Sequence, residues 1–323
     1  MLRQENEIHP PRVSIGLPVY NGENFIRETL DSLLAQTFQN FELIICDNAS
    51  TDRTETICRE YATKDKRIRY YRNSENLGAA KNYNRTFELS TGQYFKWAAH
   101  DDLCAPEFLE RSVEILDTCP SVILCYPQEH WIDDKGNIIK TNSDLLNLRS
   151  PKVTQRFKQY HDIWYQRGYM PAMVFGLIRA NELNKTKLIE EYVWADLPLC
   201  AELALRGEFY EIPEYLFFYR YHSQTSRALR KKSGNSSVLT WYNPNKKKAI
   251  AMLNWNLLLQ YIKVINRVPL NLYEKVYCYF QMGRWASWKW KKLIWELVRT
   301  TIQLQSIYFQ VIKEKIHPKT IRS

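Results

Sequence analysis

Residues 13–23, VSIGLPVYNGE, join a short apolar run to a polar turn. The run Val13–Leu17 predicts a buried strand that ends at Pro18, because proline has no N–H to donate to a sheet. Between successive runs, apolar residues recur every three or four positions, as they do in helices. The alternation predicts an α/β fold with a mostly parallel sheet flanked by helices on both faces. The further runs of strand length are Phe41–Cys46, Ile68–Tyr71, Tyr94–Ala98 and Val122–Tyr126.

The segment after the first strand illustrates the helical pattern. Ile26, Leu30 and Leu33 fall at positions i, i+4 and i+7, which is one face of a helix. Asn24 precedes them and is a residue type that caps helix N-termini. Residues 127–170, by contrast, show no readable pattern, so no element is predicted there.

Polar side chains follow three of the predicted strands. Tyr20 and Glu23 come after the first strand, Asp47 after the second, and Asp101 and Asp102 after the fourth. In such sheets, ligands bind beyond the carboxyl ends of the strands. Two adjacent carboxylates there could bind a divalent cation and a sugar hydroxyl, whereas the alternative is a helix N-terminus that favours negative charge. Asp47 could likewise be an ordinary turn residue.

Four motifs occur in a fixed order along residues 12–225. They are LPVYNGE at 17–23, DNASTD at 47–52, NLGAAKN at 76–82 and the pair Asp101-Asp102. Together they resemble the family 2 glycosyltransferases of the nucleotide-diphospho-sugar transferase superfamily. The resemblance implies a GT-A fold, which is a Rossmann-like α/β architecture, for a catalytic domain over residues 1–229.

The same resemblance implies a role for individual residues. Asp47 would face the base, most often uracil, and Asp102 and His222 would hold a divalent metal, Mn²⁺ or Mg²⁺. The segment YRYHSQTS at 219–226 is similar to the family's segment that closes the active site, where Arg220 and His222 would approach the diphosphate or the metal. His100 stands where that family often has an acidic residue. The implied contacts to the nucleotide-sugar are Pro18, Tyr20, Glu23, Asp47, Lys81 and Asp101.

A second acidic position precedes a predicted helix at Leu197–Leu205. In the family, an acidic residue that opens such a helix often deprotonates the acceptor hydroxyl, so the resemblance implies that Asp196 is the general base. The alternative is a helix N-cap, and Glu202 is a second candidate for the base. The segment Gln281–Trp285 matches the QxxRW signature of processive polysaccharide synthases, and we interpret this match as coincidence because of its distance from Asp196.

Residues 230–323 differ in composition from the rest of the chain. They hold 18 Lys and Arg against 3 Asp and Glu, and six of the ten Trp. Apolar residues recur at helical spacing at 249–265 and after Trp290. We expect a basic helical C-terminal domain that lies on an anionic membrane surface, and the alternative is a helix docked on the catalytic domain. Trp and Lys also suit nucleic acid, but no RNA-binding motif supports that partner.

The cysteine content and the apolar runs of the sequence indicate a cellular compartment. The seven cysteines form no CxxC and no even disulfide set, which favours a reducing, cytoplasmic environment. Neither an apolar run of about 20 residues nor a signal peptide is present, so any membrane contact is expected to be peripheral, at the inner face.

The resemblance as a whole implies an activity. The expected reaction is a metal-dependent, inverting transfer of a sugar from a nucleotide-diphosphate donor, expected to be a UDP-sugar, to an acceptor hydroxyl of a glycan or lipid-linked molecule. Such an enzyme would serve cell-surface glycan or polysaccharide synthesis. The alternative from another class is a non-catalytic protein that binds nucleotide-sugars or polyanions and keeps the fold.

Overall fold

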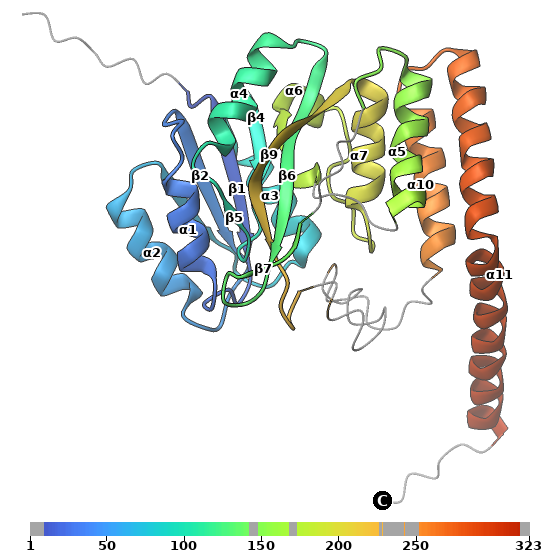
Figure 1. Ribbon diagram of the computed structural model, residues 1–323. Helices are drawn as coiled ribbons and strands as arrows, with labels where there is room; N and C mark the ends of the chain where they lie inside the picture. The colour runs from blue at the N-terminus through green and yellow to red at the C-terminus, as the bar shows by residue number, and fades with distance from the viewer. Residues whose placement is uncertain are drawn as a thin grey trace, which may run out of the picture. The chain divides into compact units, whose positions relative to one another are not determined.

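The computed structural model describes residues 10–141, 148–167, 173–225, 228, 242 and 252–316 (Figure 1). The chain divides into two compact units, Met1–Lys247 and Lys248–Ser323. The predicted domain boundary at 229/230 lies outside the described residues, so it stays a prediction.

One sheet forms the centre of the first unit, in the order β3–β2–β1–β4–β8–β6–β9–β5, with β7 paired to β6. β3, β2, β1 and β4 are parallel, as predicted, whereas β8 runs antiparallel to both β4 and β6. The predicted α/β fold is therefore confirmed, and its parallel half carries the first three motifs. The described strands are β1 Val13–Val19, β2 Phe41–Asp47, β3 Ile68–Arg72, β4 Tyr94–Trp97, β5 Leu103–Cys104, β6 Val122–Ile132, β7 Ile138–Thr141, β8 Leu177–Arg179 and β9 Glu208–Arg220.

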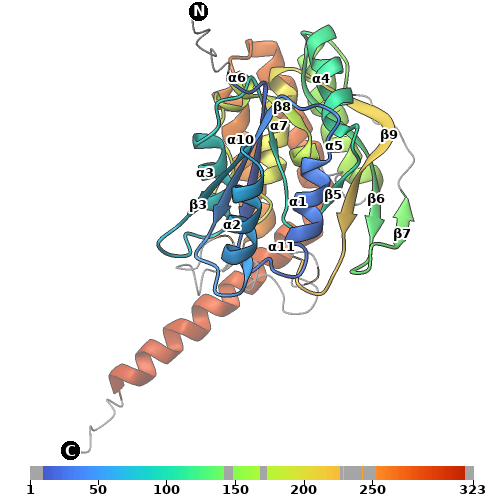
Figure 2. The same ribbon diagram turned by 90° about the vertical axis from the view of Figure 1, so that its left-hand side faces the viewer.

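Helices cover both faces of the parallel half. α1 and α2 lie on one face and α3 on the other (Figure 2). α3 approaches β1 so closely that a Cβ atom on Gly16 would lie 2.3 Å from Thr86 Oγ1, so only glycine fits there. The described helices of this unit are α1 Ile26–Leu34, α2 Thr54–Lys64, α3 Ala79–Glu88, α4 Phe108–Thr118, α5 Val153–Arg167, α6 Ala180–Leu183 and α7 Asp196–Arg206, with a 3₁₀ turn at Met173–Phe175.

Two expectations for the first strand and helix are wrong. β1 continues through Pro18 to Val19, whose carbonyl accepts a hydrogen bond from the backbone N–H of Asn48 after β2. The pairing with β4 has already ended at Gly16, so the missing N–H of Pro18 costs no hydrogen bond. Asn24 does not cap α1, which begins at Ile26 with no side-chain cap.

The segment without a readable pattern holds regular structure. β6 extends beyond Tyr126 to Ile132, and β7 and α5 follow it. The continuation of β6 contains Pro127 and two buried polar residues, Gln128 and Glu129, and its register with β9 shifts on either side of Gln128. These irregularities break the alternation on which strand prediction depends.

The second unit contains a helical pair, α10 at Leu253–Arg267 and α11 at Leu272–Ile316. The buried Glu296 of α11 accepts hydrogen bonds from the backbone N–H groups of Asn254 and Trp255 at the start of α10. The predicted C-terminal helices are therefore confirmed. Among the described residues, no helix is both long and apolar enough to cross a membrane.

Glu42 of β2 is a buried carboxylate that accepts several hydrogen bonds in the parallel half of the sheet. Its carboxylate accepts from Ser14, from Arg69 and from both the N–H and the hydroxyl of Thr91. Burial alone would raise the pKa of Glu42, but these hydrogen bonds outweigh burial and lower it.

Replacing Glu42 with glutamine is expected to reduce the free energy of unfolding by about 2 kcal/mol at neutral pH, because a buried charge partner of Arg69 is lost. Since the folded-state pKa is lowered, the difference between wild type and variant should shrink as the pH falls below about 4.5. Urea unfolding at several pH values measures it. The exposed Glu114→Gln change is the control and should cost less than about 0.5 kcal/mol.

Candidate active site

Two loops at the carboxyl ends of β1 and β2 are joined by hydrogen bonds. The backbone N–H of Asn21 donates to Ser50, that of Gly22 to Thr54 and that of Glu23 to Asp52. Three of the predicted contacts belong here. Pro18 is buried in β1, Tyr20 is exposed, and the Glu23 carboxylate accepts from Arg53 of the neighbouring loop.

Asp47 ends β2 and is fully buried. Its Oδ1 accepts from the Ser50 N–H at 2.8 Å, and its Oδ2 accepts from the Tyr70 hydroxyl at 2.8 Å and from Arg72 at 2.9 Å. The first of these bonds closes the turn that follows β2, where Ala49 adopts a positive φ of 60°. Asp47 is therefore a turn residue, and its position at the strand end also suits a ligand contact.

The third motif is fixed by a network of amides. Asn48 donates to Asn76, Asn73 donates to Asn48 and Asn82, and Asn82 donates to the Cys46 carbonyl. This network places the first turn of α3 beside the end of β2. Lys81, in that turn, is exposed and lies 3.5 Å from the carboxylate of Glu191, in the segment that leads to α7.

Asp101 and Asp102 follow β4 and differ in their partners. Asp101 Oδ2 lies 2.9 Å from His222 Nε2, and Asp102 Oδ1 accepts from the backbone N–H of Arg220 at 2.8 Å. Burial would raise the pKa of Asp101, but His100 and His222 outweigh burial and lower it. Burial and the neighbouring Asp101 together raise the pKa of Asp102 well above its usual range.

The two oxygens of Asp102 differ in their surroundings. Asp102 Oδ2 is buried and has no hydrogen-bond partner, although buried carboxylate oxygens are normally satisfied. Among the described residues, no group of three or more His, Cys, Asp and Glu side chains could hold a metal. A divalent ion at this position would take a carboxylate from Asp102 and its remaining ligands from a diphosphate and water.

Tyr83, in α3, has a pKa that depends on three carboxylates. Burial raises the pKa of Tyr83, and the charges of Asp101, Asp102 and Asp196 raise it further. Asp196 is far from the other two carboxylates in the sequence.

Asp196 is the first residue of α7, as expected. It follows Trp194, which has a positive φ of 67°, a backbone conformation that is costly for a bulky side chain and common at functional sites. α5 supports this end of the helix, because the Tyr160 hydroxyl donates to the Leu197 carbonyl at 2.7 Å. Glu202 is buried on the same helix and pairs with Arg206, so a structural role accounts for it.

Comparison with known proteins gives the family. Residues 14–180 match the sequence model of Glycosyl transferase family 2, which is about half of the chain. The chain belongs to glycosyltransferase family 2. An uncharacterized glycosyltransferase of Rickettsia typhi is 39% identical over 194 residues, which are 60% of this chain and 55% of that protein. Another, from Haemophilus influenzae, is 27% identical over 275 residues, 80% and 79% of the two chains. The chain spans about half the length of the first of these relatives.

Solved structures agree with this assignment at the level of the fold. S. aureus TarS in complex with UDP-GlcNAc aligns with a TM-score of 0.54 and 16% identity, over 80% of this chain and 82% of that one. Mannosyltransferase PcManGT from Pyrobaculum calidifontis, in complex with GDP-Man and Mn²⁺, aligns with a TM-score of 0.51 and 14% identity, over 97% and 89%. The GT-A fold expected for this family 2 chain is therefore confirmed.

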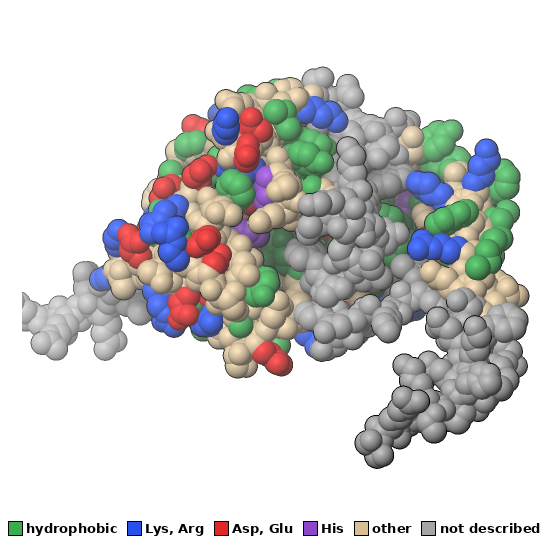
Figure 3. All heavy atoms as spheres, turned by 90° about the horizontal axis from the view of Figure 1, so that it is seen from below, with side chains coloured by type: hydrophobic (Ala, Val, Ile, Leu, Met, Phe, Trp, Pro, Cys, Tyr) green, Lys and Arg blue, Asp and Glu red, His purple; other side chains and the backbone are tan. Residues whose placement is uncertain are grey.

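Sequence reasoning missed several residues of this family 2 site. Tyr70 and Arg72 come from β3 and hold Asp47, and the charges of the three carboxylates help raise the pKa of Tyr83. Tyr70 and Arg72 could have been predicted only from the position of β3 beside β2. The burial of Arg220 was also unexpected, because its side chain was predicted to approach the diphosphate or the metal. Figure 3 shows the molecule from below the view of Figure 1, with histidine side chains at the surface of the first unit.

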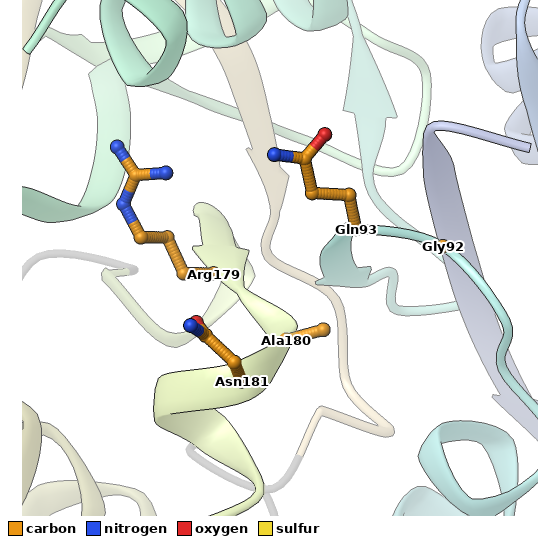
Figure 4. A pocket seen from close by; sticks show the side chains of 5 residues that line it. All are labelled: Gly92, Gln93, Arg179, Ala180 and Asn181. Atoms are coloured by element: carbon orange, nitrogen blue, oxygen red, sulfur yellow. The ribbon is translucent and has the colours of Figure 1, made fainter. Parts of the chain in front are cut away.

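Two further features of the family 2 chain lie away from this site. A cavity of about 290 Å³ borders Gln93 and Arg179, before β4 and at the end of β8 (Figure 4). This is the amino-terminal end of β4, whereas the carboxylates follow its carboxyl end. In the second unit, Gln281 and Trp285 of the QxxRW match are buried in α11, and Trp285 packs against Tyr261 of α10. Packing between the two helices explains these residues, which agrees with the interpretation of the QxxRW match as a coincidence.

Proposed function

We propose that this protein is a metal-dependent, inverting glycosyltransferase that moves a sugar from a UDP-sugar to an acceptor hydroxyl. The observation that carries the proposal is the buried, unpartnered Oδ2 of Asp102 beside Asp101 at the carboxyl end of β4. A charged carboxylate without a partner in a buried site is costly, so either a proton, as the raised pKa of Asp102 indicates, or a bound cation would neutralise it. Family membership supplies the class of reaction.

The metal side of the site would hold the leaving group. When bound, Mn²⁺ or Mg²⁺ would neutralise the negative charge of the departing diphosphate. Asp102 would be a metal ligand, and His222 a second one that releases its contact with Asp101. Asp101 would then be able to accept a hydrogen bond from a donor-sugar hydroxyl. The Mn²⁺ in the name of PcManGT is consistent with this proposal.

The acceptor side would depend on Asp196. Asp196 opens α7, and as a carboxylate it would take the proton of an acceptor hydroxyl. The hydroxyl oxygen then attacks the anomeric carbon from the face opposite the diphosphate, and the bond from carbon to diphosphate oxygen breaks. One displacement inverts the anomeric centre.

The nucleotide would lie against the ends of β1, β2 and β3. A carboxylate has about four acceptor positions, and three of those on Asp47 are filled by protein donors. The remaining position, on Oδ1, could accept the N3–H of uracil after a movement that uncovers this fully buried side chain. Tyr20 and Glu23 would flank the base and ribose, and Lys81 would approach the phosphates. TarS, named in complex with UDP-GlcNAc, supports a uridine donor.

Nucleotide titration tests the donor class. With Mn²⁺ present, isothermal titration of the full chain with UDP and with GDP should show tighter binding of UDP, by about tenfold or more. The reverse order would assign the protein to guanosine donors, as in the name of PcManGT.

The second unit would bring the protein to the inner face of a membrane, near a lipid-linked glycan acceptor. α11 buries one face against α10 and exposes a second apolar face, which includes Trp290, Ile294 and Val298. Arg299 stacks on Trp295 at 5.1 Å and Lys291 on Trp290 at 5.6 Å. Exposed apolar and basic side chains gather together on the described part of this unit (Figure 3). This combination is typical of interfacial helices on anionic lipid.

Replacing both Trp290 and Ile294 with serine is expected to weaken binding to phosphatidylserine vesicles by about tenfold or more at low salt. Both side chains are about half exposed, so the fold should survive. Co-sedimentation measures the bound fraction. The control replaces Ile138 and Ile139 of β7, which are equally exposed, and should bind as the wild type does. Negligible vesicle binding by the wild type would instead make this face a docking or dimerisation surface.

A further inference from the structure

Arg220, the last residue of β9, carries a guanidinium whose side chain is fully buried. Burying such a charge is costly unless its donors are all satisfied. Its backbone N–H already donates to Asp102, so this residue contacts the metal-side carboxylates through its main chain. The role of the Arg220 side chain therefore depends on its own contacts.

The guanidinium joins four parts of the fold. Nε donates to the Asp101 carbonyl at 2.8 Å, and a terminal nitrogen donates to Glu28 of α1 at 2.6 Å. The other terminal nitrogen donates to the carbonyls of Asp133 and Asp134, in the turn between β6 and β7. The four parts are thus β9, the turn after β4, α1 and the β6–β7 turn.

Aromatic packing extends this arrangement to the histidine. The guanidinium lies 4.8 Å from the centre of the Phe25 ring, and the same ring lies 4.6 Å from that of His222. His222 in turn contacts Asp101. Both proposed metal ligands, Asp102 and His222, are therefore held by elements that meet at Arg220.

We infer that Arg220 is a positioning residue for the metal site: its side chain holds the Asp101-Asp102 turn so that Asp102 Oδ2 stays directed at the cation. This inference rests on the proposed metal dependence. Only arginine offers five donors in a rigid planar fork, and lysine, with three donors on one nitrogen, cannot reach the same carbonyls together. The role differs from direct contact with the diphosphate, which a side chain turned into the protein cannot make.

The test is Mn²⁺ binding by the full-length Arg220→Lys variant, followed by the electron paramagnetic resonance signal of free Mn²⁺. This substitution keeps the backbone bond to Asp102 and removes only the fork. We expect the Mn²⁺ dissociation constant to rise about tenfold, while UDP binding measured in EDTA stays within twofold of the wild type. Arg156→Lys is the matched control, because Arg156 is also buried and donates to carbonyls such as that of Ala204. It should leave both constants unchanged.

Glu28→Gln provides a second variant in case Arg220→Lys does not fold. Glu28 is 57% exposed, so its loss is tolerated, and the Mn²⁺ dissociation constant should rise about threefold. An unchanged Mn²⁺ constant in a folded Arg220→Lys protein, or in Glu28→Gln if the former does not fold, would overturn the inference. An equal loss of metal-free UDP binding would show a merely structural role. A wild type that binds no Mn²⁺, even with UDP, would overturn the metal proposal itself.

Discussion

Replacing Asp102 with asparagine is expected to lower sugar transfer by a factor on the order of a thousand while the protein stays folded. The amide keeps the hydrogen bond from Arg220 to Oδ1 but cannot supply a charged oxygen to a cation. It also removes the repulsion from Asp101 that raises the pKa of Asp102. The thermal midpoint of the metal-free protein should therefore be no lower than that of the wild type.

Steady-state turnover and thermal melting with and without Mn²⁺ measure this result. Asp117→Asn serves as the control, because Asp117 pairs with Arg12 away from the carboxylates and should leave turnover unchanged. A folded Asp102→Asn protein that turns over at close to the wild-type rate would exclude Asp102 as a metal ligand.

Asp196→Asn should also abolish turnover, by a factor on the order of a thousand, but with UDP affinity within about threefold of the wild type. The base acts on the acceptor, so its loss should leave the nucleotide contacts intact. Rates with saturating donor, together with UDP titrations, separate the two effects. Joint loss of turnover and UDP binding would make Asp196 a donor-binding or structural residue.

Glu202→Gln is the matched control for Asp196. Both acidic residues belong to α7, but Glu202 is buried and paired with Arg206. Its replacement should lower the thermal midpoint, because a buried ion pair is broken, and should leave the turnover of the folded fraction unchanged. If Glu202→Gln abolished turnover at normal stability, Glu202 would replace Asp196 as the base.

The parallel half of the fold was predictable because its strands are continuous apolar runs separated by periodic helices. The strand from Val122 was predicted too short because bulges and Pro127 interrupt its pattern. β8 pairs antiparallel with β4. A strand of three residues is too short to show a recognisable pattern in the sequence, so β8 was not predicted.

The candidate site was predictable where a motif sits at a strand end. Asp101 and Asp102 follow β4 as expected, and Asp196 opens α7. Tyr83 was missed because the three carboxylates that help raise its pKa come from separate parts of the sequence. The burial of Arg220 was missed for the same reason, since its partners come from α1, the β6–β7 turn and the turn after β4.

Release of UDP from a panel of UDP-sugars tests the proposed sugar transfer, with the full chain and with Mn²⁺ either present or chelated by EDTA. We expect one donor to be turned over with Mn²⁺, even if slowly with water as acceptor, and the signal to disappear both in EDTA and in Asp102→Asn. Tight UDP binding without release from any donor would contradict the proposed transfer and indicate a nucleotide-sugar binding protein that retains the fold.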